Sequence, residues 1–206
     1  MTAADQALSA ALDALDVEAA AVRSARERVA AALPAALDLL SQATGRVIVS
    51  GIGKSGHIAA KIAATLASTG TPAQFVHATE ALHGDSGMAS PGDVAVLISN
   101  SGRTAEVCQF GRMLARRGIP VLAMTGVDDS PLALLATVHL SIAVDREADP
   151  LGLAPTASTT VTVAVGDALA AGLMARRGFT ASDFAGFHPG GSLGEDLTEP
   201  TQGGGA

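Results

Sequence analysis

Hydroxyl side chains gather in the stretch VLISNSGRTAE, which begins at Val96 and ends at Glu106. Its first three residues form a short apolar run suited to a strand buried on both faces, and small residues then turn the chain into a helix. The hydroxyls of Ser99, Ser101 and Thr104 would point, with the N–H groups of the helix start, at one spot where the helix dipole favours negative charge. The pattern predicts a phosphate-binding loop, although for a single loop of this kind a helix cap at Ser101 explains the residues equally well.

Two further strand-to-helix turns carry small hydroxyl residues: GIGKSG at 51–56 and APTASTT at 154–160. The first has the G-x-G-x-x-G spacing of a dinucleotide site, but the acidic partner expected about twenty residues further on is missing. Lys54 and Ser55 match the end of a Walker A loop, yet that loop would need glycine at position 48, which is Ile48. The three turns together therefore predict an anion site that is not an ordinary nucleotide loop.

The segments that would position these turns alternate between strands and helices. Apolar strands are expected near 46–50, 73–77, 94–99, 121–125 and 138–144, and helices near 55–68, 103–117, 131–136 and 157–176. This alternation predicts an α/β fold, a three-layer αβα sandwich around a five-stranded parallel sheet. Ligands of such sheets bind beyond the carboxyl ends of the strands, where all three turns fall.

The first forty residues follow a different pattern. Residues 3–40 are rich in Ala, Leu and Val with charges spaced among them, which predicts a helical arm that Pro34 breaks in two. Such an arm would cover the sheet or a neighbouring subunit. We therefore divide the chain into an N-terminal helical arm at 1–43, an α/β domain at 44–197 and a flexible, Gly-rich tail at 198–206.

Composition argues against several classes of function. Thirteen basic against twenty acidic residues give a net charge of −7 without a basic patch, so no nucleic-acid partner is expected. The chain has no continuous apolar span, and its first basic residue is Arg23, which predicts neither a membrane segment nor a secretory signal. The single cysteine, Cys108, fits a reducing compartment and a structural thiol. We expect a cytoplasmic protein with no membrane partner.

Longer motifs extend the pattern along the chain: GIGKSGHIAAKIAATLASTGTP, HATEALHGDSGM, ISNSGRTAE, DPLGLAPTASTT, GDALA and FHPGGSLG. With these motifs, residues 46–197 resemble the SIS (sugar isomerase) domain, and specifically the arabinose-5-phosphate isomerases of the KpsF/GutQ type. The resemblance implies a flavodoxin-like SIS sheet and the interconversion of D-arabinose 5-phosphate and D-ribulose 5-phosphate through an enediol, with no required cofactor. Two departures are Arg103, where an acidic residue is common, and the lack of the CBS domain pair that most members carry.

The resemblance also implies roles for individual residues. Catalytic groups fall on Lys54, Glu106, Glu147 and His188, and substrate contacts on Ser55, Gly70, Thr71, His83, Ser99, Ser101 and Thr104. A lysine can stabilise negative charge on the enediol, and carboxylates and an imidazole can move protons near neutral pH. His77 is associated in the family with zinc, which would inhibit rather than assist. Taken as an isolated residue, Glu106 could instead compensate a helix dipole, and Glu147 could be a solvated surface charge.

The expected partners are a sugar-phosphate substrate and further copies of the chain. The resemblance implies a homo-oligomer, a tetramer with shared active sites, and we expect His83 to cross between subunits. Three alternatives stay open: an isomerase of another sugar phosphate, a noncatalytic sugar-phosphate-binding regulator, and a dinucleotide-dependent oxidoreductase built on GIGKSG.

Overall fold

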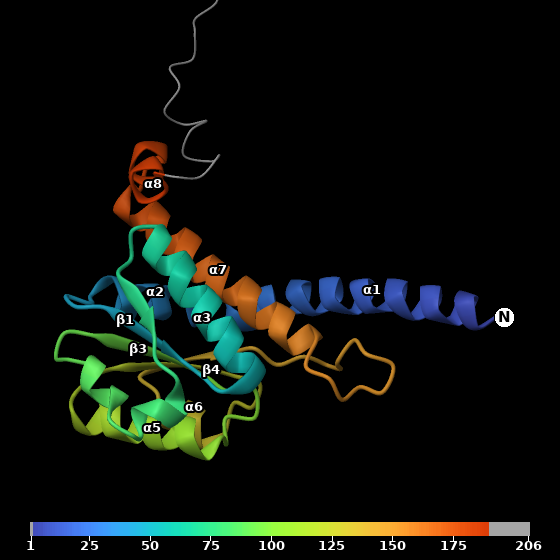
Figure 1. The fold of residues 1–206 in the computed structure, drawn as a ribbon, viewed down its shortest axis with the longest axis horizontal. Coiled ribbons are helices and arrows are strands. Elements are labelled where there is room, and N and C mark those ends of the chain that lie inside the picture. Colours follow the sequence, from blue (N-terminus) through green and yellow to red (C-terminus); the bar gives the residue numbers. More distant parts are fainter. Residues whose placement is uncertain (1, 190–206) are drawn as a thin grey trace, which may run out of the picture.

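Five parallel strands form the centre of the computed structural model, which describes residues 2–189 (Figure 1). They are β1 (Val47–Ser50), β2 (Ala73–Phe75), β3 (Val94–Ile98), β4 (Val121–Thr125) and β5 (Val138–Ser141). Their order in the sheet is β2-β1-β3-β4-β5, the flavodoxin-like arrangement. The predicted α/β fold with a five-stranded parallel sheet is confirmed.

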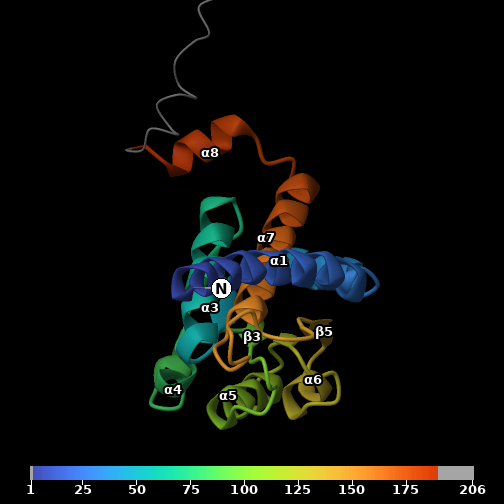
Figure 2. The same ribbon diagram turned by 90° about the vertical axis from the view of Figure 1, so that its right-hand side faces the viewer.

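Helices cover both faces of this sheet (Figures 1 and 2). One layer comprises α1 (Ala3–Val29), α2 (Leu33–Ser41), α3 (Gly53–Ser68) and α7 (Ala157–Arg177), and the other comprises α4 (Ala78–Ala81), α5 (Ala105–Arg116) and α6 (Pro131–Leu135). Strand side chains alternate between the two layers: Val49 packs with the first and Ile48 with the second. Cys108 lies in the second core, where burial raises the pKa of its thiol despite the nearby Arg112.

The helical arm breaks where the sequence predicts. The helix α1 ends at Val29, and Pro34 lies in the first turn of α2, a position that needs no backbone N–H. Three short elements were not predicted: α4, the 3₁₀ helix η1 (Asp85–Met88) and α8 (Ala181–Phe187). They are too short to show a helical period, although the capping box of Thr180 and Asp183 marks the start of α8. The predicted tail at 198–206 lies outside the described residues.

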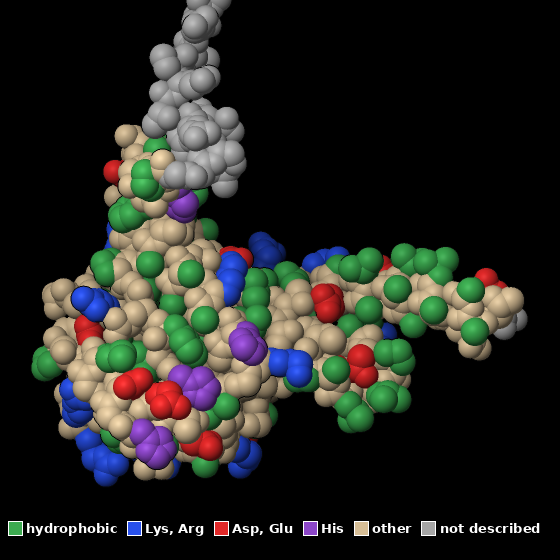
Figure 3. All heavy atoms as spheres, viewed as in Figure 1, with side chains coloured by type: hydrophobic (Ala, Val, Ile, Leu, Met, Phe, Trp, Pro, Cys, Tyr) green, Lys and Arg blue, Asp and Glu red, His purple; other side chains and the backbone are tan. Residues whose placement is uncertain are grey.

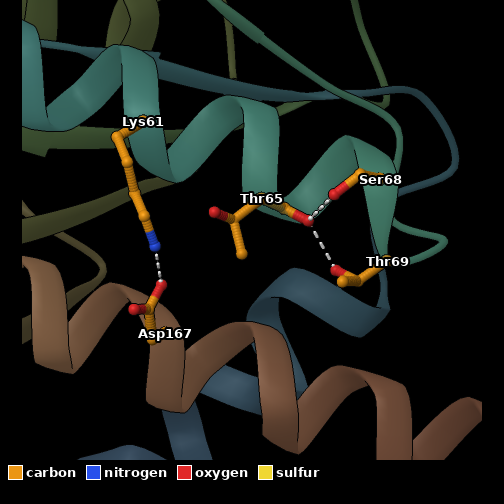
Figure 4. A network of polar contacts seen from close by, with 5 residues as sticks. All are labelled: Lys61, Thr65, Ser68, Thr69 and Asp167. Atoms are coloured by element: carbon orange, nitrogen blue, oxygen red, sulfur yellow. Dashed lines mark hydrogen bonds and ion pairs between the residues drawn. The ribbon is translucent and has the colours of Figure 1, made fainter. Parts of the chain in front are cut away.

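The helices α3 and α7 lie side by side along the domain. Gly166 makes this possible, because a Cβ there would lie 2.4 Å from the Ile62 side chain. In Figure 4, Lys61 on α3 points at Asp167 on α7 and forms an ion pair with it. At the end of α3 the hydroxyl of Thr69 donates to the Thr65 carbonyl over 2.7 Å and stabilises the last turn. The two helices therefore form one packed unit.

Among residues 2–189, α7 is the one helix whose length and composition would allow a membrane span, with a mean hydropathy of 1.3 over its most apolar stretch. Half of that stretch is buried inside the domain. The helix packs against α1, α2 and α3, so its apolar residues are accounted for by the core.

The first half of α1 extends beyond the domain, as Figure 1 shows. Its side chains are largely exposed, including Leu8, Leu12 and Leu15. The second half packs on the domain, where Ala25 and Val29 are buried. Glu18 accepts a hydrogen bond of 2.9 Å from the Thr160 hydroxyl of α7, close to the point where the arm leaves the domain.

Candidate active site

Three of the loops at the carboxyl edge of the sheet meet at one cavity. All five strands are parallel, so the loops that follow them lie at the same edge of the sheet. The strand order reverses between β1 and β3, and folds of this kind bind ligands at that place. The cavity has a volume of about 240 Å³. It is lined by Ile52, Lys54, Ser55, Ile58, Asn100, Pro155, Ser158, Thr159 and Thr162. The prediction that the three hydroxyl-rich turns converge is therefore confirmed by the fold.

The β1–α3 turn presents a helix start to this cavity. Ile52 is the N-cap of α3 and makes no side-chain hydrogen bond to the first turn, so backbone N–H groups there have no capping partner. Lys54 follows with an exposed side chain, and Ser55 is half-buried at the cavity wall. Unpaired N–H groups, a positive helix end and an ammonium group together suit an anion.

The β3–α5 loop is held by its own hydroxyls. Ser99 is buried, and its hydroxyl lies 2.8 Å from the hydroxyl of Thr104 and accepts a hydrogen bond of 3.1 Å from the N–H of Gly102. Gly102 has φ +62°, and a Cβ there would lie 2.0 Å from the Ser130 hydroxyl, so only glycine fits. Ser101 is exposed, and its hydroxyl accepts from the Arg103 N–H over 3.2 Å. Ser99 and Thr104 thus shape the loop, and Ser101 faces solvent.

Glu147 is hydrogen-bonded to the residues at the start of α7. Its carboxylate accepts hydrogen bonds from the N–H of Thr156 at 2.8 Å and the N–H of Ser158 at 3.1 Å, and from both of their hydroxyls. Burial raises the pKa of this carboxyl, but these four hydrogen bonds together outweigh burial and lower it. The structure therefore places Glu147 behind the cavity wall formed by Ser158, as a charged anchor of the helix N-terminus.

The lowered pKa of Glu147 predicts an acid-dependent contribution to stability. The carboxyl binds its proton more readily in the unfolded chain, so its contribution is present above its ordinary pKa of 4.5 and is lost as the pH falls through the lower folded value. Glu147→Gln should therefore lower the melting temperature near pH 7 by several degrees and much less near pH 3. Thermal unfolding followed by circular dichroism measures both. Glu80→Gln, at an exposed carboxylate, is the control, and an equal loss at both pH values would contradict the assignment.

Glu106 lies in the first turn of α5, at the same edge of the sheet. Its side chain is half-buried, and within residues 2–189 neither Glu106 nor Lys54 forms an ion pair. Compensation of the helix dipole accounts for the position of Glu106, but it leaves both carboxylate oxygens available to a ligand. Arg103, in the preceding loop, is also exposed.

The segment after β2 brings histidines to this edge. His77 is the N-cap of α4, and its ring meets Phe75 edge-on at 6.2 Å. Figure 3 shows histidine and acidic side chains gathered on this face, over the segment that also carries His83. Within residues 2–189, Nδ1 of His77 is buried without a hydrogen-bond partner, as is the hydroxyl of Ser50 at the end of β1. Within the described part of the chain, no group of three or more His, Cys, Asp or Glu side chains could hold a metal ion.

The remaining predicted residues lie at the opposite end of α3 and α7. Gly70 and Thr71 follow the last turn of α3, and the Gly70 carbonyl accepts a hydrogen bond from Arg177 at the end of α7. A Cβ on Gly70 would lie 2.6 Å from Phe179, whose ring stacks on Phe187 next to His188. The α7 helix has 21 residues and so spans about 30 Å. Within one chain, His188 is therefore not brought to the cavity.

His188 is held at the end of α8, where it is the C-cap residue. Its ring stacks on Phe184 at 3.9 Å between ring centres, and Nδ1 lies 2.8 Å from the Phe184 carbonyl. That contact assigns the proton to Nδ1 in the neutral ring and leaves Nε2 as the nitrogen able to accept a proton.

Sequence reasoning did not single out Asn100, Ser158 or Thr159 as cavity residues. The hydroxyl run that opens α7 was the available signal for the last two.

A parallel sheet in this order, with a lysine and several hydroxyls around a cavity at its switch point, defines an α/β domain suited to a small anionic ligand. The chain belongs to the SIS domain family, whose model matches residues 39–172.

Several named proteins are similar to this chain. The arabinose 5-phosphate isomerase KdsD of Pseudomonas aeruginosa is 53% identical over 183 residues, which are 89% of this chain and 56% of that protein. KdsD of Escherichia coli K12 is 56% identical over 153 residues, 74% of this chain and 47% of that protein. The chain thus spans about half the length of these relatives. A solved structure from E. coli CFT073 in complex with arabinose 5-phosphate is 41% identical with a TM-score of 0.87, covering 92% of this chain and all of that one.

Proposed function

We propose that this chain is an aldose–ketose isomerase that interconverts D-arabinose 5-phosphate and D-ribulose 5-phosphate. The observation that carries the proposal is an identity above one half to enzymes named for this reaction, over 89% of this chain in one case. The cavity at the switch point supports it, because a helix start, Lys54 and Ser55 offer a phosphate or an enediolate the charge it needs.

The chemistry requires proton transfers and no net oxidation. A base removes the proton from C2 of the open-chain aldose while the C1 oxygen gains a proton, which gives an enediol. Loss of the proton on the C2 oxygen and addition of one to C1 then give the ketose. Glu106 is the candidate base, Lys54 stabilises the negative charge on the enediol oxygens, and His188 opens the sugar ring or carries protons.

The proposal includes no required cofactor, because carboxylates, a lysine and an imidazole suffice for these steps. Inhibition by zinc at His77 remains part of it because the family resemblance implies it; Nδ1 of that ring has no hydrogen-bond partner within residues 2–189, but no group of three His, Cys, Asp or Glu side chains there could hold the ion. A cytoplasmic location also remains part of it, and is supported by the single buried thiol of Cys108.

An assay with a panel of aldose and ketose phosphates in deuterated water tests the proposal. We expect arabinose 5-phosphate to give ribulose 5-phosphate by NMR, with deuterium from the solvent at the carbon that receives the proton. Faster turnover of another sugar phosphate would reassign the substrate. Binding without turnover of any substrate would instead favour the regulator.

Ser101→Ala should raise KM for the sugar phosphate by about tenfold and leave kcat within about twofold, because a hydrogen bond to a charged group contributes about 1.5–3 kcal/mol. Ser101 is the exposed hydroxyl of the β3–α5 loop, whereas Ser99 is buried and engaged within it. Ser90→Ala, at an exposed serine near the opposite edge of the sheet, is the matched control. Steady-state kinetics measure both variants, and an unchanged KM for Ser101→Ala would place the phosphate elsewhere.

We further propose a homo-oligomer, a tetramer, whose active sites are shared between copies. The predicted site residues divide into a group around the cavity and a group with Gly70, Thr71 and His188 about one helix length away. If both groups act on one substrate, the second must come from another copy. His83 lies after β2 at the same sheet edge as the cavity, so the geometry favours His188 over His83 as the residue that crosses.

A further inference from the structure

Asn100 carries the β3–α5 loop to the wall of the cavity, which its exposed side chain lines. Within residues 2–189, the side-chain hydrogen bonds of this loop are made by Ser99, Ser101 and Thr104, and Asn100 takes part in none of them. An asparagine amide has two N–H donors and a carbonyl acceptor. Asn100 therefore offers a bound molecule donors and an acceptor that the described part of the chain does not use.

The other polar groups of the cavity indicate which part of a ligand this amide suits. The ammonium group of Lys54 and the N–H groups at the start of α3 can only donate hydrogen bonds, and a phosphate at neutral pH mainly accepts them. A sugar hydroxyl both donates and accepts, as an amide does. Asn100 is thus matched to a hydroxyl group, and the positive side of the cavity is matched to the phosphate.

Gly126, which follows β4, lies directly against this asparagine. Its N–H donates a hydrogen bond of 2.8 Å to the Asn100 carbonyl. A Cβ on Gly126 would lie 2.6 Å from Oδ1 of Asn100 and 3.1 Å from its carbonyl oxygen. The φ angle of Gly126 is not positive, so backbone conformation does not require glycine here. What a side chain at this position would disturb is the place of the Asn100 amide.

The β4–α6 loop that carries Gly126 is itself held in place. The hydroxyl of Thr125 donates to the Val127 carbonyl over 2.8 Å, so it accepts the hydrogen bond of 2.8 Å from Nε2–H of His139 on β5. At the other end of the loop, the N–H of Leu132 donates to the Gly102 carbonyl over 3.1 Å. Because both ends are anchored, a methyl group at position 126 should displace the amide that faces it and leave the loop where it is.

We propose that Asn100 recognises a hydroxyl group of the sugar chain and that Gly126 is a positioning residue, which sets the direction of the amide by leaving room for it. The assignment rests on the proposed function, because it takes a sugar phosphate as the ligand of the cavity. It makes Asn100 a determinant of specificity. The positive side of the cavity holds the phosphate that all such sugars share, and the amide distinguishes their sugar chains.

Calorimetric titration with arabinose 5-phosphate and with inorganic phosphate tests the recognition. The full chain carries Glu106→Gln in every sample, so that the sugar is not converted. Asn100→Ala should raise the Kd of arabinose 5-phosphate about fivefold to tenfold and leave the Kd of inorganic phosphate within about twofold. Asp129→Ala, at an exposed carboxylate of the β4–α6 loop, is the control and should change neither. Since binding is measured, a chain that binds the sugar phosphate without isomerising it still gives this result, and failure of the proposed function is distinguishable.

A double variant tests the part of Gly126. Gly126→Ala should raise the Kd of arabinose 5-phosphate about threefold, but it should add little to Asn100→Ala, because its effect passes through the amide. An unchanged Kd in Asn100→Ala, or an equal loss for both probes, would overturn hydroxyl recognition. An undiminished effect of Gly126→Ala without the amide would overturn the positioning role. If Gly126→Ala does not fold, the two probes on Asn100→Ala still decide the proposal, because truncating an exposed side chain leaves the core intact.

Discussion

Glu106→Gln should lower kcat for the isomerisation by at least about a hundredfold and change KM by less than about threefold. The substitution keeps the size of the side chain and its place at the start of α5, but the amide cannot take the C2 proton. Glu106 forms no ion pair within residues 2–189, so its loss should not break a structural contact. Steady-state kinetics from both the aldose and the ketose side measure the effect.

Asp129→Asn is the matched control, because Asp129 is an exposed carboxylate in another loop at the same edge of the sheet. It should keep wild-type kinetics. Hydrogen exchange at C2 into deuterated water separates the base from later steps. A Glu106→Gln protein that still exchanges this proton at the wild-type rate would remove Glu106 from the role of base.

Mixing Glu106→Gln with His188→Ala subunits should restore activity that neither variant has alone. If each site takes Glu106 from one copy and His188 from another, random mixing of equal amounts leaves about a quarter of the sites intact. The reason is the placement of α8, which follows α7 at the end away from the cavity (Figure 2). The measurement is specific activity after the two proteins are unfolded together and refolded.

Glu106→Gln mixed with His83→Ala provides the comparison. Both residues follow strands at the same edge of the sheet. If a site takes both from one copy, every site in the mixture lacks one of them, and the specific activity should not rise above that of the separate variants. Recovery with His83→Ala and none with His188→Ala would reverse the assignment of the crossing residue.

The sequence predicted the fold well because the signals that define it are local. The apolar runs of β1, β3 and β4 and the hydroxyl turns after two of them are visible without any knowledge of tertiary contacts. Parallel strands then place those turns at one edge, which is why the convergence at the cavity could be anticipated.

The sequence could not predict how far apart residues on different elements lie in the folded domain. Neither the position of His188 beyond the end of α7 nor the contact between Gly70 and Arg177 has a local signal, because both depend on how α3 and α7 pack. The engagement of Glu147 with the start of α7 was hidden for a similar reason. Its partners Thr156 and Ser158 are separated from it by a loop whose path the sequence does not reveal.

The close packing of α3 on α7 keeps the two groups of predicted site residues at a constant distance from each other. Gly166 against Ile62, and Lys61 paired with Asp167, prevent the helices from sliding, so their lengths set the interval between the cavity and His188. One extra turn in α7 would shift His188 by about 5 Å relative to the cavity, although every residue at both ends would be unchanged. If the site is shared between copies as proposed, the length of α7 also determines whether His188 reaches it, and we expect an insertion in the middle of α7 to lower activity as strongly as the loss of a reacting group.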